Sequence, residues 1–293
     1  MIDLNEQSFQ LRYHQNQLRD PDAIPTHLPS LNSLMHDAGG QIGFGRGWFV
    51  VWAGLPGLGK SISALSLACA ALEAGETVAY VSLEMSQVQL ASRYYSIATG
   101  LDVNFFGRGE EKFSERAWQL AQRKVESLPP IYLPDTISSD WSESVDFIKD
   151  AVETKGATFV VFDYLQLASC GTEQDIMRGI SAITTDLRAY TVQNDIVTVC
   201  LSQFNRETAA NFKMRPRAAG LWGGAIIEQS ADVIVALSHH AYERDPDGKG
   251  AKLWALVLKN RHGSVGDIPI YQSFRNLQQR EGLEDELSEW PKP

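Results

Sequence analysis

One segment strongly restricts the fold of this chain, Gly54-Leu-Pro-Gly-Leu-Gly-Lys-Ser61. A glycine-rich loop with this spacing needs a strand before it and a helix after it. Both neighbours have the required pattern, because residues 48–53 are an apolar run of strand composition and residues 60–74 have helical character. Glycines let backbone N–H groups wrap around phosphates, and the helix N-terminus adds a positive dipole. We therefore predict that this loop binds the phosphates of ATP or another NTP.

Strand-like and helix-like segments alternate along most of the chain. Runs such as 159–162 and 196–200 are apolar on both faces, as central strands of a helix-covered parallel sheet must be. We therefore predict an α/β fold with a doubly wound, mainly parallel sheet flanked by helices. The last two runs lack a long helix between them, which predicts a C-terminal β hairpin or meander. The predicted strands are 48–53, 77–83, 131–133, 158–163, 196–201, 232–237, 253–258 and about 268–275, and the predicted helices are 60–74, 86–98, 114–127, 142–155 and 174–193.

The two ends of the chain differ from its centre. Residues 1–24 are predicted to be an N-terminal segment, with a partly amphipathic stretch that leads into a proline-punctuated, extended linker. Residues 25–278 are predicted to form the main domain. Residues 279–293 are rich in acidic side chains and are predicted to be a frayed tail.

Composition excludes several classes of protein. The formal net charge is -10, which excludes a wholly basic, histone-like coat, so any nucleic-acid contact must come from local basic loops. The 3 cysteines lie far apart, which argues against a disulfide framework or a cysteine zinc site and indicates a reducing cytoplasm. No signal peptide or membrane span is expected. The neighbouring His239 and His240 are expected at the surface, and no metal beyond Mg²⁺ is indicated.

Polar residues follow three of the predicted strands, at the edge where a nucleotide would lie. Lys60 is placed to reach the β- and γ-phosphates, while Ser61 and Asp163 are placed to hold Mg²⁺. Glu84 follows residues 77–83 and is a candidate general base that activates water. Gln203 follows residues 196–201 and is a candidate sensor of the γ-phosphate. Taken singly, each acidic residue has an ordinary structural role as its alternative.

Five short strings follow the phosphate loop in a fixed order, over about residues 25–275. They are Ser82-Leu-Glu-Met85, Asp163-Tyr-Leu-Gln-Leu167, Ser202-Gln-Phe-Asn-Arg206, Ile227-Glu-Gln-Ser-Ala-Asp232 and Lys259-Asn-Arg261-His-Gly263. In this order they resemble the C-terminal motor domain of DnaB-type replicative helicases, within the RecA-like ATPases. The resemblance implies a homohexameric ring that hydrolyses NTP with Mg²⁺ at subunit interfaces. It also implies 5′-to-3′ movement on single-stranded DNA during replication, with a primase or helicase loader as further partners.

The resemblance assigns roles to particular positions. Glu84 matches the catalytic glutamate, Asp163 the Walker B aspartate and Gln203 the glutamine that senses the γ-phosphate. Lys259 and Arg261 match a lysine and an arginine finger that the neighbouring subunit inserts against the γ-phosphate. Arg93 matches an arginine near the nucleotide, and a surface arginine is its alternative. The predicted nucleotide-binding residues are Gly54, Gly57, Leu58, Gly59, Lys60, Ser61, Asp163 and Arg93.

The sequence departs from the family in its predicted DNA-binding loop. Where the family carries an arginine that grips a phosphate, this chain has Trp222, which is able to stack on a base. Gly223 and Gly224 are candidate donors of backbone N–H groups to a phosphate. The alternative is a solvated polar loop with a buried tryptophan. The basic residues predicted to contact DNA are Arg206, Lys213, Arg215 and Arg217, and a second pore-facing loop is predicted near 169–179.

About 45 residues precede the first predicted strand, so we expect neither a collar domain nor a fused primase. Such a compact motor suits a phage or another mobile element. Residues 2–18 are expected either to dock on the adjacent subunit as a helix or to be a disordered leader.

Two other functions compete with that of a helicase. The first is a RecA-like ATPase that acts as a regulator, loader or recombination mediator without unwinding DNA. The second is a scaffold that binds nucleotide without hydrolysing it, against which the full set of predicted catalytic residues argues.

Overall fold

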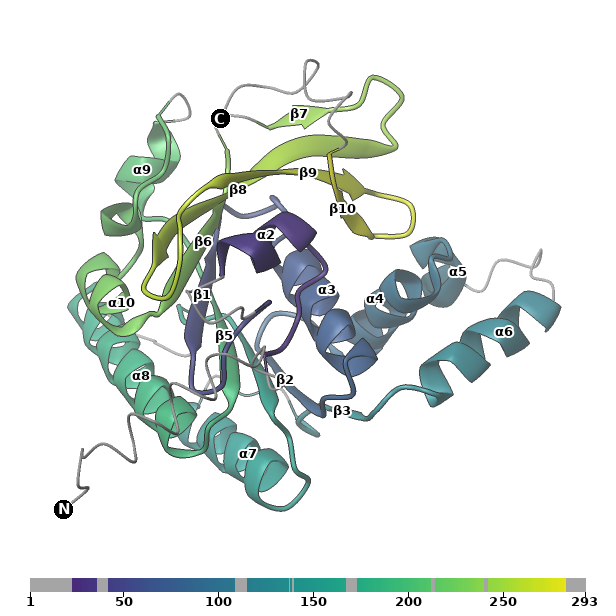
Figure 1. The fold of residues 1–293 in the computed structure, drawn as a ribbon, viewed down its shortest axis with the longest axis horizontal. Helices are drawn as coiled ribbons and strands as arrows, with labels where there is room; N and C mark the ends of the chain where they lie inside the picture. Colours follow the sequence, from purple (N-terminus) through teal and green to yellow (C-terminus); the bar gives the residue numbers. More distant parts are fainter. Residues whose placement is uncertain are drawn as a thin grey trace, which may run out of the picture.

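The computed structural model describes residues 23–35, 42–108, 115–136, 138, 140–166, 173–211, 214–239 and 242–282. Within these residues the predicted α/β architecture is confirmed: one sheet has helices on both of its faces (Figure 1). The strands are β1 Phe49–Ala53, β2 Val78–Ser82, β3 Ile131–Tyr132, β4 Phe159–Asp163, β5 Val197–Ser202, β6 Val233–Leu237, β7 Glu243–Arg244, β8 Gly250–Asn260, β9 Asp267–Ser273 and β10 Gln279–Glu281.

The five long helices lie where the periodicity places them. They are α3 Lys60–Glu73, α4 Gln87–Thr99, α6 Glu115–Glu126, α7 Trp141–Glu153 and α8 Glu173–Gln193. Helix α3 packs on one face of the sheet, and α7 and α8 cover the other (Figure 1). Five short elements were not expected from the sequence: α2 Pro29–Leu34, α5 Val103–Arg108, α9 Arg206–Ala210, η1 Ala218–Gly220 and α10 Gly224–Ser230.

The centre of the sheet is parallel, and its C-terminal part is antiparallel. The strand order is β10-β9-β8-β6-β1-β5-β4-β2-β3, and β7 pairs with β8. All five residues of β1, β2, β4 and β6 are buried, as is every residue of β5, because helices cover both faces. The antiparallel β6, β8, β9 and β10 confirm the expected C-terminal meander. The carboxyl ends of β1, β2, β4 and β5 therefore share one edge.

The prediction of an extended linker after the first 20 residues is wrong for the part that the structure describes. Ile24 forms a β-bridge with Phe44, and Leu28 is fully buried. Pro29 begins α2, since proline at the first helical position already has the backbone angle of a helix. This segment therefore belongs to the core of the domain, while residues 1–22 lie outside the described residues.

Two further expectations need correction. The predicted tail begins with a strand, because β10 pairs with β9 and the guanidinium of Arg280 lies over the Tyr271 ring; residues 283–293 lie outside the described residues. His239 is buried and packs edge-on against the Phe204 ring, since it follows the buried strand β6. Among the described residues, no helix is long and apolar enough to cross a lipid bilayer.

Candidate active site

The loop from Gly54 to Gly59 joins β1 to α3 at the carboxyl edge of the sheet. Gly57 and Gly59 have φ values of +80° and +89°, a conformation that only glycine adopts at little cost. A Cβ on Gly59 would lie 2.1 Å from Oε1 of Gln272 on β9. The loop therefore follows a tight path that ends directly at the N-terminus of α3, the geometry of a phosphate-binding loop.

Lys60 lies folded over this loop. Its side chain is buried, and its Nζ donates a hydrogen bond to the Leu55 carbonyl at 3.1 Å. Burial lowers the pKa of Lys60, whereas the carboxylates of Asp163 and Glu84 raise it. The ammonium group thus sits among the loop and two carboxylates, where a phosphate would gain a buried positive partner.

Asp163 ends strand β4 and is fully buried. Its Oδ2 accepts a hydrogen bond from the Tyr80 hydroxyl at 3.2 Å, and its Oδ1 has no hydrogen-bond partner among the described residues. Burial raises the pKa of Asp163 to about 6; the Glu84 charge also raises it, while Ser61, Lys60 and Tyr80 lower it. An orphaned carboxylate oxygen beside a serine hydroxyl is a donor set that suits a hard cation such as Mg²⁺.

Glu84 lies next to Asp163 because Ser82, two residues before it, is paired in register with Asp163. The Glu84 side chain is exposed, so it remains open to water and substrate. Arg93 on α4 is half-buried. Burial raises the pKa of the Tyr80 hydroxyl, and the positive charge of Arg93 lowers it. Helix α4 is fixed by a capping box at Ser86.

Gln203 follows β5 at the same edge. Its side chain hydrogen-bonds to Tyr164, the residue after Asp163. Its backbone carbonyl accepts from the Trp222 N–H at 3.1 Å. Gln203 therefore lies between the nucleotide site and the loop that leads to α10.

Lys259 and Arg261 lie at the other end of the sheet, near the amino ends of the parallel strands. Strand β8 runs antiparallel to β6, and Lys259 pairs with Ile234 near the amino end of β6. The Arg261 N–H donates to the Asp232 carbonyl, and the Asp232 N–H donates to Phe49, the first residue of β1. The phosphate loop begins five residues after Phe49, which is roughly 16 Å along a strand. One chain therefore does not bring its finger residues to its own phosphate loop.

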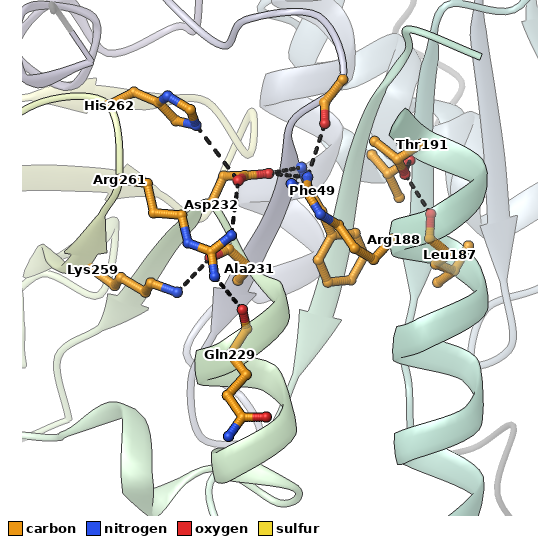
Figure 2. Close-up of polar contacts among 12 residues, drawn as sticks. Phe49, Leu187, Arg188, Thr191, Gln229, Ala231, Asp232, Lys259, Arg261 and His262 are labelled. Carbon is orange, nitrogen blue, oxygen red and sulfur yellow. Dashed lines mark hydrogen bonds and ion pairs between the residues drawn. The ribbon is translucent and has the colours of Figure 1, made fainter. Parts of the chain in front are cut away.

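Instead, both side chains hold the end of α10 (Figure 2). The Lys259 Nζ donates to the carbonyl of Ala231 at 2.7 Å and to that of Glu228. Arg261 donates to the carbonyl of Gln229. Burial and the Arg261 charge lower the pKa of Lys259. These contacts give the last carbonyls of a short helix positive partners.

Asp232 anchors this cluster. It is 2% exposed, and its Oδ2 accepts from the Phe49 N–H at 2.8 Å and from Arg188 of α8. Its Oδ1 lies 3.5 Å from both Arg261 and His262 (Figure 2). Burial opposes ionisation, but the nearby His262, the hydrogen bond from the Phe49 N–H and the Arg188 charge leave the pKa of Asp232 lowered. The carboxylate, just after the end of α10, therefore connects β1 and α8 with the residues that follow β8.

Residues 23–278 match the family model of the DnaB-like helicase C terminal domain. The chain belongs to this family. It is 32% identical to a probable plasmid replicative DNA helicase of Chlamydia psittaci, over 83% of this chain and 52% of that protein. It is 28% identical to the replicative DNA helicase DnaB of Geobacillus stearothermophilus, over 88% and 57%. The chain thus spans little more than half the length of these relatives.

Solved structures of the DnaB-like family have the same fold. The ATPase domain of G40P superposes with a TM-score of 0.78 at 21% identity, covering 96% of this chain and 100% of that one. A DnaB-like replicative helicase, studied for its interactions with primase, has a TM-score of 0.75 at 21% identity, covering 96% of this chain and 67% of that one.

The predicted DNA-binding loop, in which this member departs from the DnaB-like motif, is pinned at its base. Phe204 forms a β-bridge with Leu221. Trp222 is half-buried against the core, and the Gly224 N–H donates to the Leu221 carbonyl at 2.9 Å. Gly223 is buried as well. In this conformation the Gly224 amide is not a phosphate donor, because an internal carbonyl already occupies it.

The basic residues of the loop have different surroundings. Arg206 and Arg217 are exposed, and no salt bridge within the described residues involves either of them. Arg215 pairs with Asp267 of β9, at 2.7 Å for one of its two contacts, and this raises the pKa of Arg215. Lys213 lies outside the described residues, as do residues 169–172 of the second predicted loop. Residues 173–179 of that predicted loop are instead the first turns of helix α8.

Three residues that shape the site were not expected from the sequence. Tyr80 contacts Asp163, Gln272 covers Gly59, and Arg188 holds Asp232. A tyrosine between the apolar residues Ala79 and Val81 of β2 was a visible signal, because a buried hydroxyl requires a partner. Gln272 and Arg188 gave no such signal, because glutamine and arginine are ordinarily exposed residues whose presence does not imply a buried partner.

Proposed function

We propose that this chain is the ATP-hydrolysing motor of a replicative DNA helicase, which works as a homohexamer with each active site shared between two copies. The observation that carries this proposal is the separation of the finger residues from the phosphate loop by the length of β1. A second copy supplies the missing Lys259 and Arg261 when the amino ends of its parallel strands face the carboxyl ends of the parallel strands in the first copy.

In the proposed site, one copy binds the nucleotide. Lys60 neutralises the β- and γ-phosphates, and backbone N–H groups of the loop hold their oxygens. Ser61 and Asp163 hold Mg²⁺, which when bound neutralises charge on the phosphates. Glu84 orients the attacking water and accepts its proton, while Gln203 contacts the γ-phosphate.

The neighbouring copy then completes the site. Arg261, assisted by Lys259, stabilises the negative charge that develops on the transferred phosphoryl group. Because Arg261 leaves its contact with Gln229 to do so, hydrolysis is tied to the interface between copies. Gln203 joins the nucleotide to the loop that carries Trp222, which gives the DNA contact a route to the same site.

Single-stranded DNA is the proposed substrate of movement, with Arg206 and Arg217 contacting phosphates and Trp222 stacking on a base. Movement in the 5′-to-3′ direction, a primase or loader partner, and a cytoplasmic location complete the proposal. Family membership supports all three. Contact with a primase is also supported by the related replicative helicase whose structure was studied for its interactions with primase.

A second candidate function is a DNA-bound or protein-bound ATPase that regulates or loads other factors without unwinding. The half-buried Trp222 and the occupied Gly224 amide favour it, because they weaken the predicted grip on DNA. Stimulation of ATP hydrolysis by single-stranded DNA separates the two: the motor requires it, and its absence would favour the regulator.

The shared site is tested by mixing two inactive variants, Lys60→Ala and Arg261→Ala. In mixed assemblies, some interfaces join an intact loop to an intact finger, so part of the ATPase activity should return. Native mass spectrometry of isotopically distinct variants verifies that mixed assemblies form. Activity that stays absent in verified mixed assemblies would refute the shared site.

A further inference from the structure

We propose that Tyr80 is a positioning residue that orients the metal-binding carboxylate of Asp163. This inference deepens the proposed function and rests on it, because it concerns the same Mg²⁺-nucleotide site. Nothing in the catalytic motifs includes this tyrosine, which lies in the middle of β2.

The placement of Tyr80 follows from strand register. Tyr80 pairs with Val161 and Ser82 pairs with Asp163, so Tyr80 lies one side-chain repeat before the carboxylate on the neighbouring parallel strand. Both Tyr80 and Asp163 are fully buried. The aromatic ring spans this repeat, and its hydroxyl donates to Oδ2 at 3.2 Å.

The hydrogen bond divides the two carboxylate oxygens. Oδ2 is engaged by Tyr80, and Oδ1 is buried without a hydrogen-bond partner among the described residues. The hydroxyl of Ser61, the other proposed metal ligand, also stabilises the ionised carboxylate. A carboxylate held by one oxygen presents the other in a fixed orientation, which removes the entropy cost of ordering it when a cation binds. Apolar residues flank Tyr80 in β2, so burial alone does not require a hydroxyl at this position.

The test is the full chain carrying Tyr80→Phe, which removes one oxygen and keeps the ring that fills the core. Affinity for a fluorescent ATP analogue is measured in EDTA and in excess Mg²⁺. We expect unchanged affinity in EDTA and a gain from Mg²⁺ that is about 10-fold smaller than in the wild type. In turnover, the Mg²⁺ concentration for half-maximal rate should rise more than kcat falls.

Tyr190→Phe is the matched control, because the Tyr190 hydroxyl also donates to a carboxylate, that of Glu153 at 3.2 Å, but on α8 away from the loop. It should change neither affinity. An unchanged Mg²⁺ gain in Tyr80→Phe would overturn the inference. So would equal losses in EDTA and Mg²⁺ together with a lower melting temperature, since these indicate a purely structural role. A wild-type chain without any gain from Mg²⁺ would instead refute the proposed function.

Discussion

Gly59 combines two constraints at the scale of a single residue. Its φ is +89°, and the buried amide of Gln272, held by Gln279, occupies the space that a side chain would need. The first constraint acts on any L-residue at a cost of about 1–2 kcal/mol. The second depends on a strand more than 200 residues later in the chain, so it was not predictable from the loop motif.

Gly59→Ala should therefore lower both the melting temperature and nucleotide affinity. Gly156→Ala is the matched control, because Gly156 has φ +72° with open space around it. The loss of unfolding free energy at Gly59 should exceed that at Gly156, and adding Gln272→Ala should recover the excess. Denaturant unfolding of Gly59→Ala, Gly156→Ala, Gln272→Ala and the Gly59→Ala/Gln272→Ala double variant measures these terms. Equal losses of unfolding free energy at both glycines would show that the Gln272 side chain moves aside without a loss of stability.

His27 gives a second prediction at this scale. It is half-buried, its Nε2 contacts Gln279, and burial lowers its pKa to about 4. The unfolded chain therefore binds a proton below pH 6.5 that the folded chain rejects, so this residue removes stability as pH falls from 6.5 toward 4.

His27→Gln keeps a hydrogen-bonding group and removes the titration. The wild type should lose unfolding free energy more steeply than this variant between pH 6.5 and 4, and the two should run parallel above pH 7. Chemical denaturation at a series of pH values checks this. Parallel curves over the whole range would contradict it.

At the scale of elements, the buried carboxylate of Asp232 contacts β1, α8 and the segment that follows β8. Asp232→Ala leaves the Phe49 N–H without its acceptor and removes the carboxylate partner of Arg188, which keeps only its hydrogen bond to the Gly47 carbonyl. This should lower the free energy of unfolding by about 3 kcal/mol. Asp267→Ala breaks the exposed Arg215 pair and should cost less than about 1 kcal/mol. Urea unfolding compares the two variants, and similar losses would contradict the anchoring role.

The elements also show how far the sequence could lead. Hydrophobic runs located the buried strands. Polar residues at or after their carboxyl ends, such as Asp163 and Glu84, indicated the end of the sheet that carries the phosphate loop, because parallel strands end together. The packing of α2 and β10 was missed, since a proline-rich or acidic composition reads as irregular. The contacts of Arg261 with α10 were also out of reach, because they depend on how β8 pairs with β6.

For the whole molecule, the separated half-sites predict a dependence on protein concentration. ATP turnover per chain should rise as assemblies form, whereas nucleotide affinity should remain nearly constant, because the phosphate loop is complete within one chain. Turnover and sedimentation measured over the same dilution series test this. Full turnover per chain in a strictly monomeric sample would contradict the shared site.

The placement of finger and loop at opposite edges also governs how copies can be arranged. Such a contact is heterologous, so each added copy leaves an unmatched donor at one terminus of the row and an unmatched acceptor at the other. An open row of any length therefore has one unused half of an active site at each end. Joining the two extremities creates one more working site from surfaces already present, which gives closure an advantage without any additional kind of contact.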